Sequence, residues 1–128
     1  SGENPLVCWG DGTPIRDFIY AGDCADAMVH LVENGVTEPV NLGSGDGVSI
    51  KEVAEAIRDS YDKSIPIDWD ITKPKGDARR LMDTTRAESY GFKCSTTLKD
   101  GIKETLEWFL ENPNLYKTRN NYFTEGDE

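Results

Sequence analysis

Two side chains near the start of this sequence are suited to holding a ligand: the indole of Trp9 and the guanidinium of Arg16. Trp9 begins a glycine-rich turn that ends at Pro14, and the alternating run Ile15 to Tyr20 predicts a short strand after it. A guanidinium at the start of a strand, beside an aromatic ring, suits a phosphate with a flat group next to it. The alternative is a charged residue that only keeps the end of a strand hydrated.

Four cationic residues lie within a second stretch of eight residues, in which Asp77 is the one acid. They are Lys73, Lys75, Arg79 and Arg80. The whole 128-residue chain, in contrast, has a formal net charge of -10 at pH 7 and a pI of about 4.5, which argues against a nucleic-acid partner. A local cationic loop on an anionic protein suits a small anion such as a diphosphate. The alternative is a solvated loop that binds nothing.

A glycine loop, Gly43 to Gly47, stands between an expected strand at Pro39 to Leu42 and a helix that starts at Ser49. A dinucleotide-binding loop occurs in this context, but the third glycine of G-x-G-x-x-G would fall at Val48. We therefore expect a tight structural turn, with a phosphate cradle as the alternative.

Helical and strand periodicities alternate along the chain and predict an α/β protein, with a small mixed sheet and packed helices. The expected helices are 23–33, 49–61, 85–90 and 97–112, and a further strand is expected within 63–71. Capping boxes, S/T-x-x-E, are expected at Ser49 with Glu52 and at Thr85 with Glu88. We expect residues 1–115 to form the folded part and 116–128 to be a polar, acidic, flexible tail.

Several classes of protein are disfavoured by the composition. No apolar run is long enough to span a membrane, so we expect a cytoplasmic protein with no membrane partner. Three widely spaced cysteines predict reduced thiols, and the lone His30 has no metal-site spacing around it. We therefore expect no metal site.

The run Trp9 to Asp23, WGDGTPIRDFIYAGD, resembles the sequence that opens the C-terminal substrate-binding part of extended short-chain dehydrogenases/reductases, the NAD-dependent epimerase/dehydratase family. Three further runs resemble that family in the same order, and together they cover roughly residues 5 to 112. They are PVNLGSGDGVSIKEVAEAI, DITKPKGDARRLMDTTRAESYGF and TTLKDGIKETLEWFLEN. Trp9 and the pattern KP-x-G-x-x-R, from Lys73 to Arg79, are most similar to the GDP-L-fucose synthase branch.

This resemblance implies a role in binding a nucleotide diphosphate sugar, with the base expected to be guanine. The residues that match substrate-binding positions of the family are Trp9, Arg16, Lys73 and Arg79. The chain departs from the synthase pattern at Lys75 and at Asp77-Ala78, which leaves the base and the sugar open.

The resemblance further implies that the intact parent is an NAD(P)-dependent epimerase, reductase or dehydratase. Its Tyr-x-x-x-Lys dyad is absent here, because no lysine stands four residues after any of the five tyrosines. We therefore expect no catalytic residue and no bound cofactor in this fragment, and a missing N-terminal dinucleotide-binding domain as its partner. Whether the fragment is itself an enzyme stays open.

Two alternatives remain: a stand-alone nucleotide-sugar-binding or assembly module without catalysis, and a fragment of a UDP-sugar epimerase or dehydratase. By the resemblance, the helix at 23–33 and the strand at Pro39 to Leu42 are similar to elements that dock onto the missing dinucleotide-binding sheet, so their apolar faces would be uncovered here. We therefore expect a homo-oligomer, either a dimer or a swapped arrangement.

Overall fold

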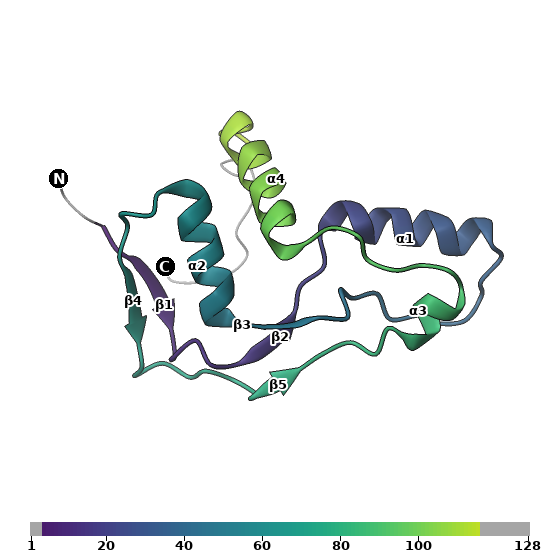
Figure 1. Cartoon of the computed structure of the whole chain (residues 1–128), viewed down its shortest axis with the longest axis horizontal. Coiled ribbons are helices and arrows are strands. Elements are labelled where there is room, and N and C mark those ends of the chain that lie inside the picture. Colours follow the sequence, from purple (N-terminus) through teal and green to yellow (C-terminus); the bar gives the residue numbers. More distant parts are fainter. Residues whose placement is uncertain (1–3, 116–128) are drawn as a thin grey trace, which may run out of the picture.

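The computed structural model describes residues 4–115, which form short strands and helices (Figure 1). In chain order the elements are β1 (Leu6–Trp9), β2 (Ile15–Asp17), α1 (Ala21–Glu33), β3 (Gly47–Ser49), α2 (Ile50–Tyr61), β4 (Ile67–Asp70), β5 (Arg79–Arg80), α3 (Thr85–Ser89) and α4 (Leu98–Glu111). The expected α/β class with a small mixed sheet and packed helices is confirmed. The tail predicted at 116–128 lies outside the described residues.

The strands form two small sheets. β1 pairs in parallel with β4, and Leu6 lies opposite Ile67. In the second sheet β2 lies in the middle, antiparallel to β3 and parallel to β5. This arrangement brings the cationic segment around residue 79 alongside the strand that carries Arg16, although more than 60 residues separate them in the sequence.

Two helices, α2 and α4, pack against each other next to the second sheet (Figure 1). The capping box predicted for α2 is confirmed: the Glu52 amide donates to Ser49 Oγ over 3.1 Å, and the Ser49 amide donates to Glu52 Oε2 over 2.7 Å. Thr97 caps α4 by accepting from the Asp100 amide. These local hydrogen bonds fix where the two helices begin.

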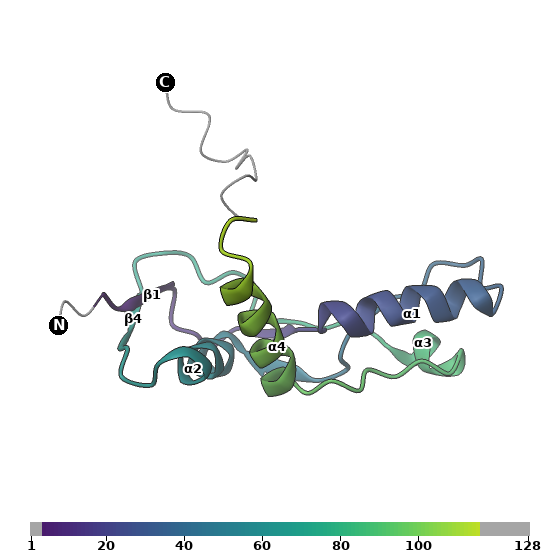
Figure 2. The ribbon, with the colours of Figure 1, turned by 90° about the horizontal axis from the view of Figure 1, so that it is seen from above.

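Helix α1 extends away from α2 and α4 and lies beside α3 (Figure 2), and it is held at its first turn by Asp23. The Asp23 carboxylate, on a residue that is 8% exposed, accepts four hydrogen bonds: from Cys94 Sγ, the Ser95 amide, the Thr96 amide and Thr96 Oγ1, at 2.8 to 3.1 Å. These hydrogen bonds, led by that from Cys94, lower the pKa of Asp23 to about 2. The start of α1 is thereby tied to the segment that leads into α4.

Three expectations were wrong in detail. Pro39–Leu42 is not a strand, because among the described residues no neighbouring strand pairs with it. The first predicted strand ends at Asp17, three residues before Tyr20. The short helix is preceded by Thr84 instead of Thr85, and Thr84 makes no capping hydrogen bond to the backbone.

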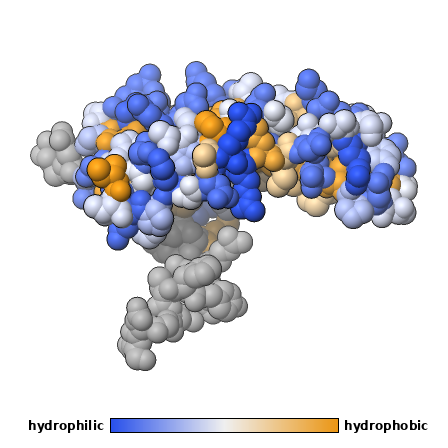
Figure 3. Space-filling view, turned by 90° about the horizontal axis from the view of Figure 1, so that it is seen from below, coloured by the Kyte–Doolittle hydropathy of each residue, from blue (hydrophilic) through white to orange (hydrophobic). Residues whose placement is uncertain are grey.

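Little of this structure is a closed hydrophobic core. In residues 4–115 the buried hydrophobic residues are Ala27, Ala54 and Ala87. Larger apolar side chains remain at the surface, and Figure 3 shows hydrophobic residues exposed next to strongly hydrophilic ones on one face. Over the same residues, no helix combines the length and the apolar character needed to cross a lipid bilayer.

We expect Ser49→Ala to lower the free energy of unfolding by about 1 kcal/mol, because it removes the acceptor that satisfies the first turn of α2. Urea denaturation of the 128-residue chain measures this change. Ser60→Ala is the matched control, since the Ser60 hydroxyl binds a carbonyl within the same helix. Equal effects of the two substitutions would contradict the assigned role of the cap.

We also expect the stability of the chain to fall as the pH drops from about 4 to about 2. The pKa of Asp23 lies below its ordinary value in the folded chain, so its contribution is present above the unfolded pKa and is lost as the carboxylate becomes protonated. That contribution is about 1 to 2 kcal/mol after allowance for solvent screening. Between pH 2 and pH 6, the free energy of unfolding should depend less on pH in Asp23→Asn than in the unchanged chain, as denaturation curves at each pH can measure. Asp26→Asn, at an exposed position of the same helix, should keep the pH dependence of the unchanged chain.

Candidate anion-binding site

The candidate site is formed by two segments that lie side by side: the glycine turn, residues 9–14, and the cationic loop, residues 72–80. The Gly10 amide donates to the carbonyl of Asp70 just before the loop, and the Ile15 amide donates to that of Ala78, each over 2.9 Å. The backbones approach closely, since a Cβ at Gly10 would lie 2.9 Å from Lys75 Cβ. Gly10 also has φ +82°, a conformation that favours glycine.

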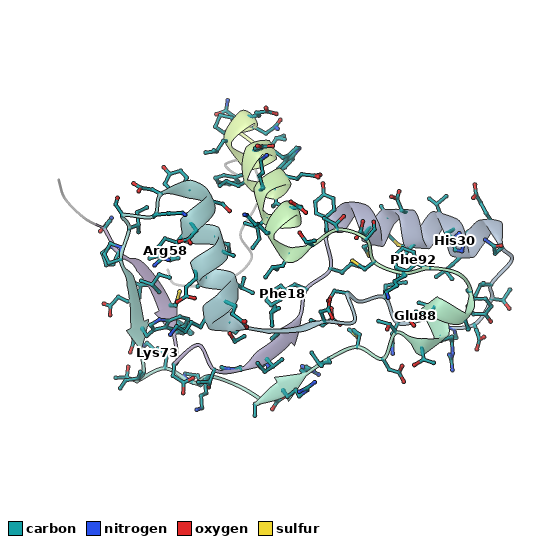
Figure 4. The ribbon with its side chains drawn as sticks, in the orientation of Figure 1. Phe18, His30, Arg58, Lys73, Glu88 and Phe92 are labelled. Atoms are coloured by element: carbon teal, nitrogen blue, oxygen red, sulfur yellow. The ribbon has the colours of Figure 1, made fainter. Side chains whose placement is uncertain are left out.

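Trp9 and Lys73 meet at one end of this site. The Lys73 ammonium lies 5.5 Å from the centre of the Trp9 ring, within the range of a cation–π contact. Trp9 is 65% exposed, so much of the ring is open to a ligand. Figure 4 places Lys73 near the ends of β1 and β4, on a different part of the molecule from Arg58 of α2.

Arg16 lies in β2, with its guanidinium against the cationic loop. Its Nη1 donates to the carbonyl of Ile15 over 2.8 Å, and its Nη2 lies 3.2 Å from the position that a Cβ on Gly76 would occupy. In the pairing of β2 with β5, Arg16 lies opposite Arg80, and Ile15 lies opposite Arg79. Because successive residues of a strand alternate faces, Arg80 shares a face with Arg16 and Arg79 lies on the other face.

Of the four residues predicted for the site, Trp9 and Lys73 are neighbours. Arg16 and Arg79 lie on adjacent strands with their side chains on opposite faces, so the structure does not bring these two together. Arg80 entered the sequence reasoning only as part of a charge cluster. Arg80 lies opposite Arg16 because it belongs to β5, a strand of two residues that is too short to give a strand periodicity in the sequence.

Asp11 is a further residue of the site that the sequence did not single out. Its Oδ2 accepts from Lys75 Nζ over 2.8 Å, and its Oδ1 accepts from the amide and the hydroxyl of Thr13 at 3.1 and 2.6 Å. The hydrogen bond from Lys75 is the largest cause of a pKa well below the usual range for the Asp11 carboxyl, and the hydrogen bonds from Thr13 lower this pKa further. The pattern D-x-T at Asp11 to Thr13 is typical of an Asx turn, so the contact with Thr13 could have been predicted. The contact with Lys75 could not, because Lys75 is 64 residues from Asp11.

The glycine loop at 43–47 is occupied by a carboxylate of the chain itself. Asp17 Oδ1 accepts from both the amide and the hydroxyl of Ser44 over 2.7 Å. A Cβ at Gly43 would lie 2.6 Å from Asp17 Oδ2, a buried oxygen with no hydrogen-bond partner in the described part of the chain. The loop presents negative charge where a pyrophosphate would need free amides, so these residues do not fit a dinucleotide.

No activated acid, base or metal ligand set accompanies the cations in the described residues. Hydrogen bonds from Tyr20 to Glu104 and from Tyr90 to Glu38 raise the pKa of these phenols, which is the opposite of what proton transfer near neutral pH requires. No group of three His, Cys, Asp or Glu residues within 4–115 could hold a metal ion. His30 Nε2 lies 2.7 Å from the carbonyl of Tyr90. The arrangement is suited to binding an anion.

Comparison with known proteins gives consistent results. Residues 1–43 match the model of the NAD dependent epimerase/dehydratase family. A putative GDP-L-fucose synthase 2 of Arabidopsis thaliana is 44% identical over 108 residues, which are 84% of this chain and 33% of that protein.

Solved structures of two kinds of enzyme are similar to the structure of this chain. A GDP-L-fucose synthetase from Naegleria fowleri bound to NADP has a TM-score of 0.74 at 28% identity, over 88% of this chain and 35% of that one. A UDP-glucose 4-epimerase from Bifidobacterium longum in complex with NAD+ and UDP has a TM-score of 0.72 at 29% identity, over 86% of this chain and 36% of that one.

The chain thus spans about a third of the length of the relatives it matches. The similarity nevertheless extends over more than four fifths of the chain, in both the sequence and the structure comparisons. By these matches the chain belongs to the NAD-dependent epimerase/dehydratase family, and GDP-L-fucose synthases are among its relatives.

Proposed function

We propose that this chain is the nucleotide-sugar-binding part of an NAD(P)-dependent epimerase or reductase, and that its ligand is a GDP-linked sugar. The observation that carries the proposal is the meeting of the glycine turn with the cationic loop. Lys73 of the loop lies over the exposed Trp9 ring, and Gly76 of the same loop lies close to the Arg16 guanidinium, although the turn and the loop are far apart in the sequence. Synthases of GDP-L-fucose among the relatives favour guanine as the base.

The chemistry of the surface suits a diphosphate joined to flat or ring-shaped groups. A guanidinium such as that of Arg16 donates several hydrogen bonds to phosphate oxygens, and the Lys73 ammonium adds a point charge. Arg79 was also predicted for the site, but its side chain lies on the other face of the paired strands from that of Arg16. Trp9 offers a rigid aromatic surface to a base or a sugar ring. Binding, orientation and charge neutralisation are the contributions proposed for these residues.

Hydride and proton transfer are assigned, within this proposal, to the parts of the relatives that this chain does not span. NAD(P) would bind there, since the glycine loop at 43–47 does not fit a dinucleotide and Tyr20 and Tyr90 are not activated. The proposed partner is therefore a dinucleotide-binding domain that precedes residue 1 in the intact protein, which would be cytoplasmic.

An apolar groove is the proposed contact surface for that partner. It has a volume of about 470 Å³ and lies between the end of β2, α2 and α4. Ile57 and Phe18 line it, and Figure 4 shows the position of Phe18. Helix α1 adds Met28, Val29 and Val32, which are 54%, 57% and 77% exposed. So many large apolar side chains on a small protein mark a surface that is covered in the assembled protein.

A UDP-linked sugar is the second candidate ligand. The UDP-bound epimerase has a TM-score within 0.02 of that of the GDP-L-fucose synthetase, so the fold alone does not favour one base over the other. A module that binds the same ligand without catalysis would use the same residues.

Calorimetric titration of the 128-residue chain with GDP, GDP-sugars, UDP and UDP-sugars tests the proposal, with NADPH as the control ligand. We expect GDP compounds to bind and NADPH not to bind. Arg16→Ala should weaken the binding about tenfold or more, because a charge-assisted hydrogen bond contributes about 1.5 to 3 kcal/mol. Arg58→Ala is the matched control, since Arg58 pairs with Asp59 on α2. Preference for UDP would select the second candidate, and indifference to Arg16→Ala would exclude Arg16 from the site.

We further expect the isolated chain to associate with itself, because a second copy can cover the apolar face of α1 when no partner domain is present. Light scattering over a wide concentration range measures this association. Val29→Lys should shift the chain towards monomer, whereas Glu33→Lys, at an exposed position of the same helix, serves as a control for charge. A monomer at all concentrations would contradict the prediction.

A further inference from the structure

We propose that the ion pair between Asp11 and Lys75 positions the anion site: it holds the cationic loop on the glycine turn, so that Lys73 stays against the Trp9 ring. This inference rests on the proposed function, because it says what keeps the proposed site in shape. It assigns to Asp11 and Lys75 a positioning role, with no direct contact to the ligand.

Asp11 is oriented before Lys75 contributes. The amide and the hydroxyl of Thr13 both donate to Oδ1, which fixes the rotamer of the carboxylate and leaves Oδ2 free to accept from Lys75 Nζ over 2.8 Å. Part of the entropy loss that usually weakens an exposed ion pair is thus already incurred within the turn.

The backbone at Lys75 and Gly76 also passes close to the glycine turn and to Arg16. Lys75 Cβ lies 2.9 Å from the position of a Cβ on Gly10, and Gly76, the next residue, passes the Arg16 guanidinium. Lys73 is two residues before Lys75 and carries the ammonium that lies 5.5 Å from the Trp9 ring. The ion pair is therefore at the centre of a short segment whose two ends contact the two proposed ligand-binding side chains.

A positioning role for Asp11 predicts an unexpected change in the affinity for an anion when the charge of Asp11 is removed. Asp11 is an acid next to a proposed anion site, so removal of its charge should strengthen anion binding if only the local electrostatic field mattered. If Asp11 instead positions the loop, removal of its charge should weaken binding, because Lys75 is no longer held and Lys73 loses its contact with the Trp9 ring. The two explanations predict opposite changes in affinity.

The test compares Asp11→Asn with the unchanged chain by calorimetric titration with GDP and by NMR. Asparagine keeps an oxygen for Thr13 and lacks the charge that holds Lys75. We expect the dissociation constant for GDP to rise about two- to fivefold, the range that an exposed ion pair can account for. We also expect the ε-methylene protons of Lys73 to lose the upfield shift caused by the ring current of Trp9.

Two further variants act as controls. Asp77→Asn removes an acid of the same loop for which the described structure gives no ion pair, so the affinity should stay equal or increase. The double substitution Asp11→Lys with Lys75→Asp restores a pair of opposite polarity, and it should recover the ring-current shift even if the Asp11→Asn chain is less well folded.

Stronger GDP binding by Asp11→Asn, or an unchanged Lys73 shift in that variant, would overturn the inference. If the unchanged chain binds no nucleotide, the proposed function fails for this chain. The ring-current shift then decides by itself whether the ion pair holds Lys73 on Trp9.

Discussion

Backbone pairing around β2 is the constraint on which the rest of the structure depends. Along this segment, Pro14 accepts from the Ile50 amide, Gly12 accepts from the Lys51 amide, and the Ile15 amide donates to Ala78. Since the buried hydrophobic residues of the described part are alanines, apolar packing alone would not join these segments. The hydrogen bonds of β2 attach α2 on one side and the cationic loop on the other, so the same strand that carries Arg16 also gathers the site around it.

Three carboxylates of this acidic chain anchor one segment to another. Asp17 holds the glycine loop, Asp23 holds the start of α1, and Asp11 holds the cationic loop. Each accepts at least one hydrogen bond from a backbone amide, which is favourable to an ionised carboxylate. These three acids thus join segments that are far apart in the sequence, while the cations of the loop remain at the surface. This division explains how a chain with a net charge of -10 can still present a cationic site.

Sequence reasoning succeeded where a few neighbouring residues determine the structure. Ser49 and Glu52 are three residues apart and make the box that starts α2, and apolar periodicity identified α4 because its residues contact α2 on one face. Pro39–Leu42 was wrong as a strand since its backbone needs a neighbour that the described residues do not supply. The register of Arg16 with Arg80 and the pairing of Asp11 with Lys75 involve residues about 64 positions apart. Such contacts follow from the assembled sheet and leave no local pattern.

Solvent exposure limits what the site can do by itself. Trp9 is 65% exposed and the cationic loop is exposed throughout residues 71–80, so the attraction of its cations for an anion is screened by water and salt. The same charges would attract a diphosphate far more strongly if a second surface excluded water from them. The uncovered apolar groove and the exposed face of α1 indicate where such a surface would attach. Under the proposed function, therefore, this chain supplies the arrangement of the charges, and the strength of binding would depend on the covering of the site.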